Sequence, residues 1–93
     1  MQPFELTDKV SLAEEVLLQE LAGESVLLNL ASESYFGLDD VGTRMLTVLQ
    51  ASESIQGAYE QLLMEYEVEA EPLKEDLLSF IEMLREHGLV VVE

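Results

Sequence analysis

The chain has 93 residues, 48% of them hydrophobic, which is enough for one domain with its own core and excludes a second independent core. It carries 20 acidic side chains against 4 Lys and Arg, and a net charge of −16 at pH 7 disfavours binding to nucleic-acid phosphates. The absence of cysteine, of a membrane-spanning apolar run and of a signal-peptide pattern predicts a cytoplasmic protein without disulfides, thiolate metal sites or membrane association.

Short strands are predicted in the first 38 residues. Residues 1–9 are expected to be a loosely ordered lead-in, and residues 10–12 a short edge strand. Three further strands are expected at residues 15–21, 24–30 and 34–38. Short turns rich in Gly, Ala and Ser separate these three strands and predict an antiparallel meander.

The second of these three strands has apolar side chains on both faces. Val26, Leu28 and Leu30 share one face because side chains alternate along a strand. Leu27 lies on the opposite face, which predicts that this face is also partly covered.

The third strand carries an adjacent aromatic pair and runs directly into a predicted helix. If Leu38 faces the core, Phe36 points inward as well, and Tyr35 and Gly37 point outward. A strand in this position can keep one unpaired edge, and an open edge beside a helix is a groove for an extended peptide. The absence of a side chain at Gly37 would let another backbone approach closely.

Three helices are predicted for most of the remaining chain. Asp39 or Asp40 is expected to cap the first, which runs to about Leu49, and Ser54 to cap the second. Pro72 fits the first turn of the third helix, where its missing N–H has no helical partner to lose. Apolar stripes at helical spacing mark the three buried faces: Val41, Met45, Val48 and Leu49; Ile55, Ala58, Tyr59, Leu62, Leu63 and Tyr66; Leu73, Leu77, Phe80, Ile81 and Leu84.

The end of the third helix and the acidic segments offer little chemistry. His87, the only histidine, precedes Gly88 and is predicted to end the helix rather than to act as an acid–base catalyst. Residues 89–92 form a β-prone tail. The acidic residues between 65 and 71 lack the spacing of a calcium loop and are predicted to be solvated surface. Three strands followed by three helices, the last two at helix-turn-helix spacing, predict a winged helix-turn-helix-like α+β domain.

One flank of the third helix carries two of the four basic residues. Lys74, Leu78 and Arg85 lie about 60 to 100 degrees round the helix from Leu77, at 100 degrees per residue. They form either a binding flank or ordinary surface pairs with neighbouring acids. The opposite flank stays open as an alternative, with the residues Asp76, Met83 and His87.

Several short motifs follow one another in a fixed order along the chain. They are Leu27-Leu28, Tyr35-Phe36, Leu38-Asp39, Gly42, Ser54-Ile55, Glu65-Tyr66, Asp76, Phe80-Ile81, Leu84 and Gly88-Leu89. In this order and spacing the chain resembles the PqqD-like family, whose domains are also called RiPP precursor-peptide recognition elements. The resemblance covers about residues 10–92. It departs mildly at Ile81, where Leu is commoner, and at Asp39, where Asn is common.

The resemblance implies one winged-helix-like domain over residues 1–93 that binds the leader of a ribosomally synthesised precursor peptide. The leader would add as an antiparallel strand to the third strand and lie against the third helix, where Lys74 and Arg85 would meet acidic leader residues. No catalytic residue, cofactor or metal is expected. The expected leader-binding residues are Ser34, Tyr35, Phe36, Gly37, Leu38, Lys74, Leu78, Ile81 and Arg85.

The resemblance also implies partners. The chain is most similar to the free-standing form of lasso-peptide biosynthesis, which works beside a separate leader peptidase and a cyclase, so the expected partners are a precursor peptide and such a maturation enzyme. One alternative is a PqqD-type chaperone of pyrroloquinoline quinone synthesis, which serves a radical SAM enzyme. Another is a winged-helix transcription regulator, which the acidic third helix disfavours. A monomer or a weak homodimer formed through the open edge is expected.

Overall fold

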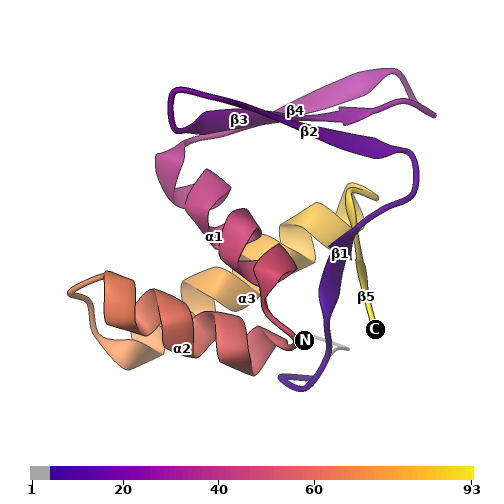
Figure 1. The fold of residues 1–93 in the computed structure, drawn as a ribbon. Helices are drawn as coiled ribbons and strands as arrows, with labels where there is room; N and C mark the ends of the chain where they lie inside the picture. Colours follow the sequence, from indigo (N-terminus) through magenta and orange to yellow (C-terminus); the bar gives the residue numbers. More distant parts are fainter. Residues whose placement is uncertain (1–4) are drawn as a thin grey trace.

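A computed structural model describes residues 5–93 of the protein (Figure 1). One antiparallel sheet, in the order β2-β3-β4, lies across the helices, and β1 and β5 form a separate two-stranded antiparallel sheet. This confirms the predicted α+β fold of a three-stranded sheet followed by three helices. The elements are β1 (Val10–Leu12), β2 (Val16–Leu21), β3 (Glu24–Asn29), β4 (Ser34–Leu38), α1 (Asp40–Ala51), α2 (Ile55–Glu65), α3 (Ala70–Glu86) and β5 (Val90–Val92).

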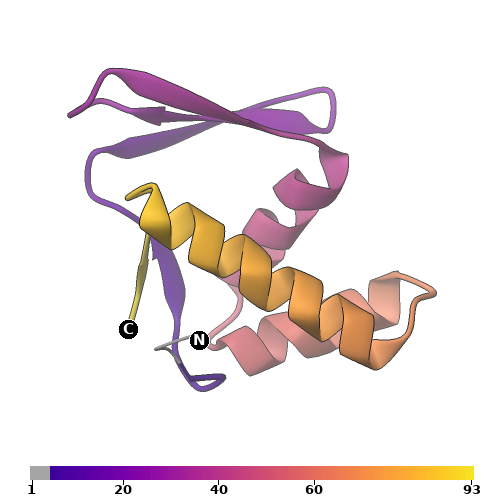
Figure 2. The ribbon, with the colours of Figure 1, turned by 180° about the vertical axis from the view of Figure 1, so that it is seen from behind.

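The helices meet below one face of the three-stranded sheet, and α3 crosses in front of α1 in the view of Figure 2. The side chains that are fully buried come from every layer, so one core joins the sheet, the helices and β1. No helix in residues 5–93 combines the length and the apolarity that crossing a membrane requires. The largest fully buried side chains are Val10, Leu27, Leu46, Leu49, Ile55, Leu62, Leu77, Ile81 and Leu84.

In β3 the core-facing side is the one with fewer apolar residues. Leu27 is fully buried, whereas Val26 and Leu28 are only half-buried and Leu30 is exposed. The helices cover the Leu27 side, and there the hydroxyl of Ser25 is satisfied by a buried hydrogen bond with Thr43 of α1 (2.7 Å between the two oxygens). The larger apolar set therefore lies on the outer face of the sheet.

The helix boundaries follow the predicted caps. Asp39 Oδ1 accepts a hydrogen bond from the Gly42 N–H (2.8 Å), and Ser54 Oγ accepts one from the Gly57 N–H (3.0 Å). α3 starts at Ala70, so part of the expected acidic connection is already helical and the later proline still falls in the first turn. The stripe of α1 differs from the prediction, because Leu46 is fully buried and Val41 is 43% exposed.

Residues 1–4 of the expected lead-in lie outside the described part, and the expectation of loose order is wrong for residues 5–9. Lys9 Nζ donates hydrogen bonds to the carbonyl oxygens of Leu49, Gln50 and Ser52 at 2.5 to 3.3 Å. These carbonyls lie at the C-terminal end of α1, where a cation is favourable. The backbone of Lys9 also pairs with Glu93 in both directions, which continues the β1–β5 ladder.

Candidate functional site

β4 keeps one free edge in the described part of the chain. It pairs with β3 alone, with Leu27 opposite Phe36 and Ser25 opposite Leu38. As predicted from the alternation, Leu38 is buried and Phe36 half-buried, whereas Tyr35 is exposed on the other face. The N–H and C=O groups along the free edge are available to a further strand.

A groove of about 670 Å³ runs between this edge and α3. Its floor is mostly apolar and its walls come from β4, the start of α1 and one flank of α3. At the end of α3 the rings of Phe36 and His87 lie 5.1 Å apart, which links the strand to the helix. The lining residues are Phe36, Gly37, Leu38, Asp39, Val41, Gly42, Met45, Asp76, Ser79, Phe80 and Met83.

Two glycines of this region have different environments. A Cβ added at Gly42 would lie 3.4 Å from a ring carbon of Phe80 and 3.4 Å from Asp39 Oδ1, so the start of α1 packs tightly against the groove floor. A Cβ added at Gly37 would meet nothing within 4 Å, so the strand is open there. This space lies on the outer face of the sheet, to which position 37 points, so that face is open beside the free edge.

α3 turns a different flank toward β4 than the one that carries its basic residues. Asp76, Ser79 and Met83 line the groove, whereas Lys74 and the Arg85–Glu82 ion pair (2.8 Å) do not. Leu78 packs half-buried against the core and Ile81 is fully buried in it. Leu77, Ile81 and Leu84 fix the core-facing direction of the helix, but an apolar residue borders this stripe on either side. The helical period alone therefore does not decide which flank meets the sheet.

The groove is acidic to neutral. Its charged side chains are Asp39 and Asp76, and no basic residue is among those that line it. The basic residues that lie elsewhere include Arg44 of α1, which holds Glu65 of α2 in a two-pronged ion pair (Arg44 Nε to Glu65 Oε1, 2.7 Å). These hydrogen bonds and a further one from Gln61 lower the pKa of Glu65 to about 2. The groove therefore favours neutral or basic side chains of a ligand over acidic ones.

A smaller apolar pocket of about 240 Å³ continues the groove at the start of α3. It shares Val41, Met45 and Asp76 with the groove, so an extended ligand that leaves the groove past α1 would reach it directly. The side chain of Asp76 stands at the junction of the two. The pocket is lined by Val41, Met45, Tyr66, Val68, Pro72, Leu73 and Asp76.

The sequence matches the model of the family described as coenzyme PQQ synthesis protein D over residues 24–90. The chain belongs to the PqqD family. This confirms the predicted relationship, and proteins of the PqqD family are binding domains without catalytic activity. No curated protein matches the chain.

Two solved structures are similar to the chain over most of its length. TbiB1 in complex with the TbiA(beta) leader peptide is 30% identical, with a TM-score of 0.79, and the match covers 88% of this chain and 93% of that one. Lasso peptide synthetase B1 complexed with the leader peptide is 25% identical, with a TM-score of 0.81 and coverage of 89% and 98%. These PqqD relatives therefore hold leader peptides.

The structure brings together only part of the residue set predicted from the sequence. Phe36, Gly37 and Leu38 line the groove, while Ser34 lies at the exposed start of β4 and bonds Ser32 (2.6 Å between the hydroxyl oxygens). Sequence reasoning did not name Ser79 as a site residue, and it placed Phe80 in the buried stripe of the third helix rather than in a groove. The open alternative of the opposite flank did contain Asp76, Met83 and His87.

Proposed function

We propose that this PqqD-family chain is a non-catalytic adaptor that binds the leader of a ribosomally synthesised precursor peptide in the groove between β4 and α3. The observation that carries the proposal is the free edge of β4 beside an open, mostly apolar groove. The leader peptides held by the two similar structures support it. The adaptor presents the bound precursor to a separate enzyme, the leader peptidase of lasso-peptide biosynthesis.

The leader adds to β4 as an antiparallel strand. Main-chain hydrogen bonds along the free edge then supply affinity that depends little on sequence, and alternate side chains enter the groove and supply specificity. Because β4 runs from Ser34 to Leu38, the N-terminal end of an antiparallel peptide lies near Leu38. The adjoining pocket behind Val41 then receives an apolar side chain that precedes the paired segment.

Electrostatics narrows the class of leader. Asp39 and Asp76 are the charged residues that line the groove, so the paired segment carries neutral or basic side chains there. Met83 and Phe80 provide the apolar wall against which its inward side chains pack. This replaces the contact between acidic leader residues and Lys74 or Arg85 that the sequence predicted.

The test uses fluorescein-labelled leader peptides of lasso precursors, with the TbiA(beta) leader among them, in fluorescence anisotropy. We expect saturable binding of at least one leader, loss of that binding in Met83→Glu, and wild-type affinity in Met64→Glu on the exposed surface of α2. N-methylation of the leader backbone should weaken binding at alternate positions only, because every second N–H of an added strand faces β4. Failure of every leader to bind, or an affinity unchanged by Met83→Glu, would overturn the proposal.

A second candidate keeps the same groove and changes the partner. The family description favours a role in pyrroloquinoline quinone synthesis. Under this alternative the partner is the radical SAM enzyme that the family resemblance implies. Binding of the precursor peptide of that pathway in preference to every lasso leader would decide for it.

A further inference from the structure

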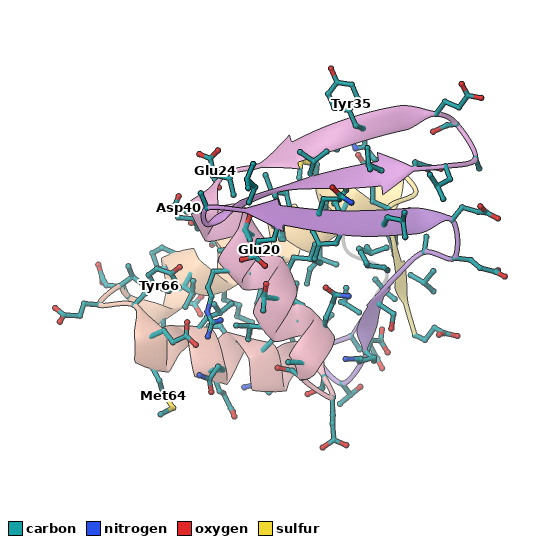
Figure 3. The ribbon with its side chains drawn as sticks, turned by 45° about the horizontal axis from the view of Figure 1, so that its top comes forward. Glu20, Glu24, Tyr35, Asp40, Met64 and Tyr66 are labelled. Carbon is teal, nitrogen blue, oxygen red and sulfur yellow. The ribbon has the colours of Figure 1, made fainter. Side chains whose placement is uncertain are left out.

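The outer face of the three-stranded sheet is apolar and uncovered by the described residues. The strand register aligns Leu17, Leu28 and Tyr35 in one row across the sheet. Leu21 at the end of β2 is 82% exposed and Tyr35 is 77% exposed. Figure 3 shows Tyr35 pointing away from the helices. The apolar side chains of this face are not part of the hydrophobic core that joins the sheet to the helices.

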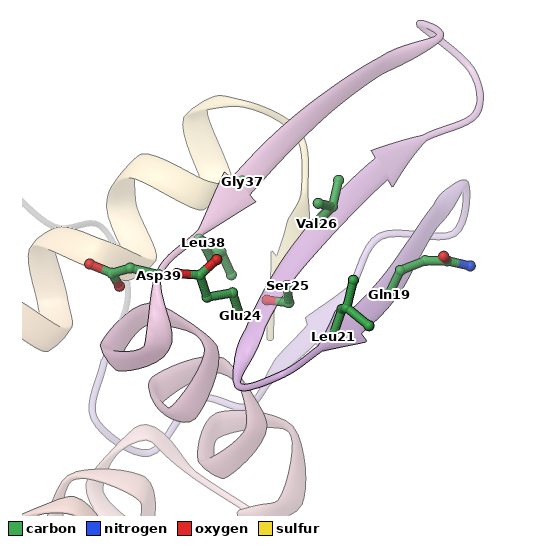
Figure 4. A pocket seen from close by; sticks show the side chains of 8 residues that line it. All are labelled: Gln19, Leu21, Glu24, Ser25, Val26, Gly37, Leu38 and Asp39. Atoms are coloured by element: carbon green, nitrogen blue, oxygen red, sulfur yellow. The ribbon is translucent and has the colours of Figure 1, made fainter.

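The same face is bordered by carboxylates. Glu24 lies at its α1 end (Figure 3), and Glu15 and Glu33 lie at the opposite ends of the strands. Close to Glu24 the face is hollowed by about 430 Å³, with Leu21 and Val26 on the sheet side and the carboxylates of Glu24 and Asp39 at the edge (Figure 4). An Arg or Lys side chain fits this combination, because its aliphatic part can pack on the apolar wall while its charged end meets the acidic edge.

We propose that this outer face docks a second protein whose contact surface is apolar at its centre and carries Arg or Lys at its rim. The inference rests on the proposed function, under which the partner is the maturation enzyme to which the leader is presented. Apolar contact in the centre supplies the affinity, and the acidic rim steers a basic partner and sets its orientation.

A second copy of the chain fits the face poorly. A two-fold contact would set the same patch against itself, so the acidic rim of one copy would face the acidic rim of the other. Each copy has a net charge of −16, and like charges across an interface are unfavourable.

The face is continuous with the leader groove. Tyr35 and Gly37 occupy the outer face of β4, the strand whose free edge takes the leader. A leader strand added there extends the sheet, and its outward side chains come to lie beside Tyr35. A protein docked on this face thus contacts chain and leader together, so leader binding strengthens its docking.

The test uses the purified chain, a fluorescein-labelled leader that binds it, and the purified leader peptidase of the same pathway. The double variant Leu17→Glu/Leu21→Glu places charges on β2, away from the leader groove. Met64→Glu on α2 is the matched control, because Met64 is 83% exposed and far from the sheet (Figure 3). Three quantities are measured: leader affinity, association with the peptidase by biolayer interferometry, and the rate of leader cleavage.

We expect the double variant to melt and bind the leader like the wild type, while peptidase association and leader cleavage fall by about tenfold or more. Glu24→Arg should also weaken association, and high salt should weaken it in the wild type. Unchanged association and cleavage in the double variant, or an equal loss in Met64→Glu, would overturn the inference. So would a dimer in sedimentation velocity that the double variant abolishes, since the face would then serve a second copy.

The leader measurement separates the two proposals. If the wild type binds no leader, the proposed function fails at that step, and association with the peptidase is still measured on the chain alone. Absence of that association in the wild type overturns the docking face independently.

Discussion

The rings of Phe36 and His87 lie 5.1 Å apart at an interplanar angle of 59°, and this contact joins β4 to the C-terminal end of α3. His87 Nδ1 lies 2.9 Å from the carbonyl oxygen of Met83, to which a protonated Nδ1 donates. The contact therefore holds the groove-lining turn of α3 beside the strand. It lies on the same flank of α3 as Met83, which lines the groove, and not on the flank with Lys74.

The first prediction compares two half-buried apolar residues on opposite flanks of α3. Met83→Ala should weaken leader binding by roughly 1–3 kcal/mol, because Met83 lines the groove. Leu78→Ala should leave leader affinity unchanged, since Leu78 lies on the other flank. Isothermal titration calorimetry on both folded variants checks this, and the reverse pattern would place the leader on the flank that carries Lys74 and Arg85.

The second prediction concerns the buried hydroxyl pair between the sheet and α1. Thr43→Val removes the partner of the Ser25 hydroxyl and should lower the free energy of unfolding by roughly 1–3 kcal/mol. Adding Ser25→Ala removes the unsatisfied group as well, so the double variant should lose less than the sum of the single losses. Urea unfolding of the three variants measures the coupling, and strict additivity would mean that the hydrogen bond does not form in solution.

The third prediction separates core from surface on the helices. Leu77→Ala empties a fully buried position and should cost roughly 2–5 kcal/mol of unfolding free energy. Met64→Ala, at an exposed position, should change it by less than about 0.5 kcal/mol. Thermal unfolding followed by circular dichroism distinguishes the two, and similar losses would contradict the packing of α3 described here.

The fourth prediction is a titration. The Arg44 hydrogen bonds lower the pKa of Glu65 to about 2, so the folded state holds this proton less tightly than the unfolded chain. The ion pair therefore stabilises the fold fully above the ordinary pKa of about 4.5, and this contribution is lost as the pH falls through about 2. An NMR titration of the Glu65 carboxyl should show the low value in the wild type. A value that stays low in Arg44→Gln would assign the shift to another group.

The fifth prediction tests the N-terminal segment. Lys9→Met keeps the apolar stem but removes the cation from the C-terminal end of α1, and it should cost roughly 1–2 kcal/mol of unfolding free energy. Hydrogen exchange should rise first in the last turn of α1, where the carbonyl partners lie. Protection there that equals the wild type would mean that Lys9 is dispensable.

Local signals predicted most of the fold. Asp39 and Ser54 cap helices, Gly88 adopts the positive φ (+71°) that favours glycine, and the alternation in β4 turns Phe36 inward. Each depends on side chains within a few positions of one another, which a sequence displays directly. The free edge of β4 followed from the same local order.

What could not be predicted depends on contacts between distant segments. The β1–β5 pairing and the Lys9 contacts join positions about 40 to 80 residues apart, and nothing in the local pattern of either segment names its partner. The flank of α3 that lines the groove could not be decided from the sequence for a related reason. Leu78 on one side of the core stripe and Phe80 on the other give the helix two equally apolar borders, and only the crossing of α3 with β4 decides between them.

The pairing of Val10 with Val92 has a mechanical consequence. A force applied to both ends of the described chain pulls β1 and β5 apart like a zipper, so their hydrogen bonds break one after another rather than together. A pair of strands that is pulled apart in this way separates at low force. Opening the zipper removes the backbone pairing that holds Lys9 against the end of α1, so an unfolding machine that grips either end would meet its least resistance at that sheet.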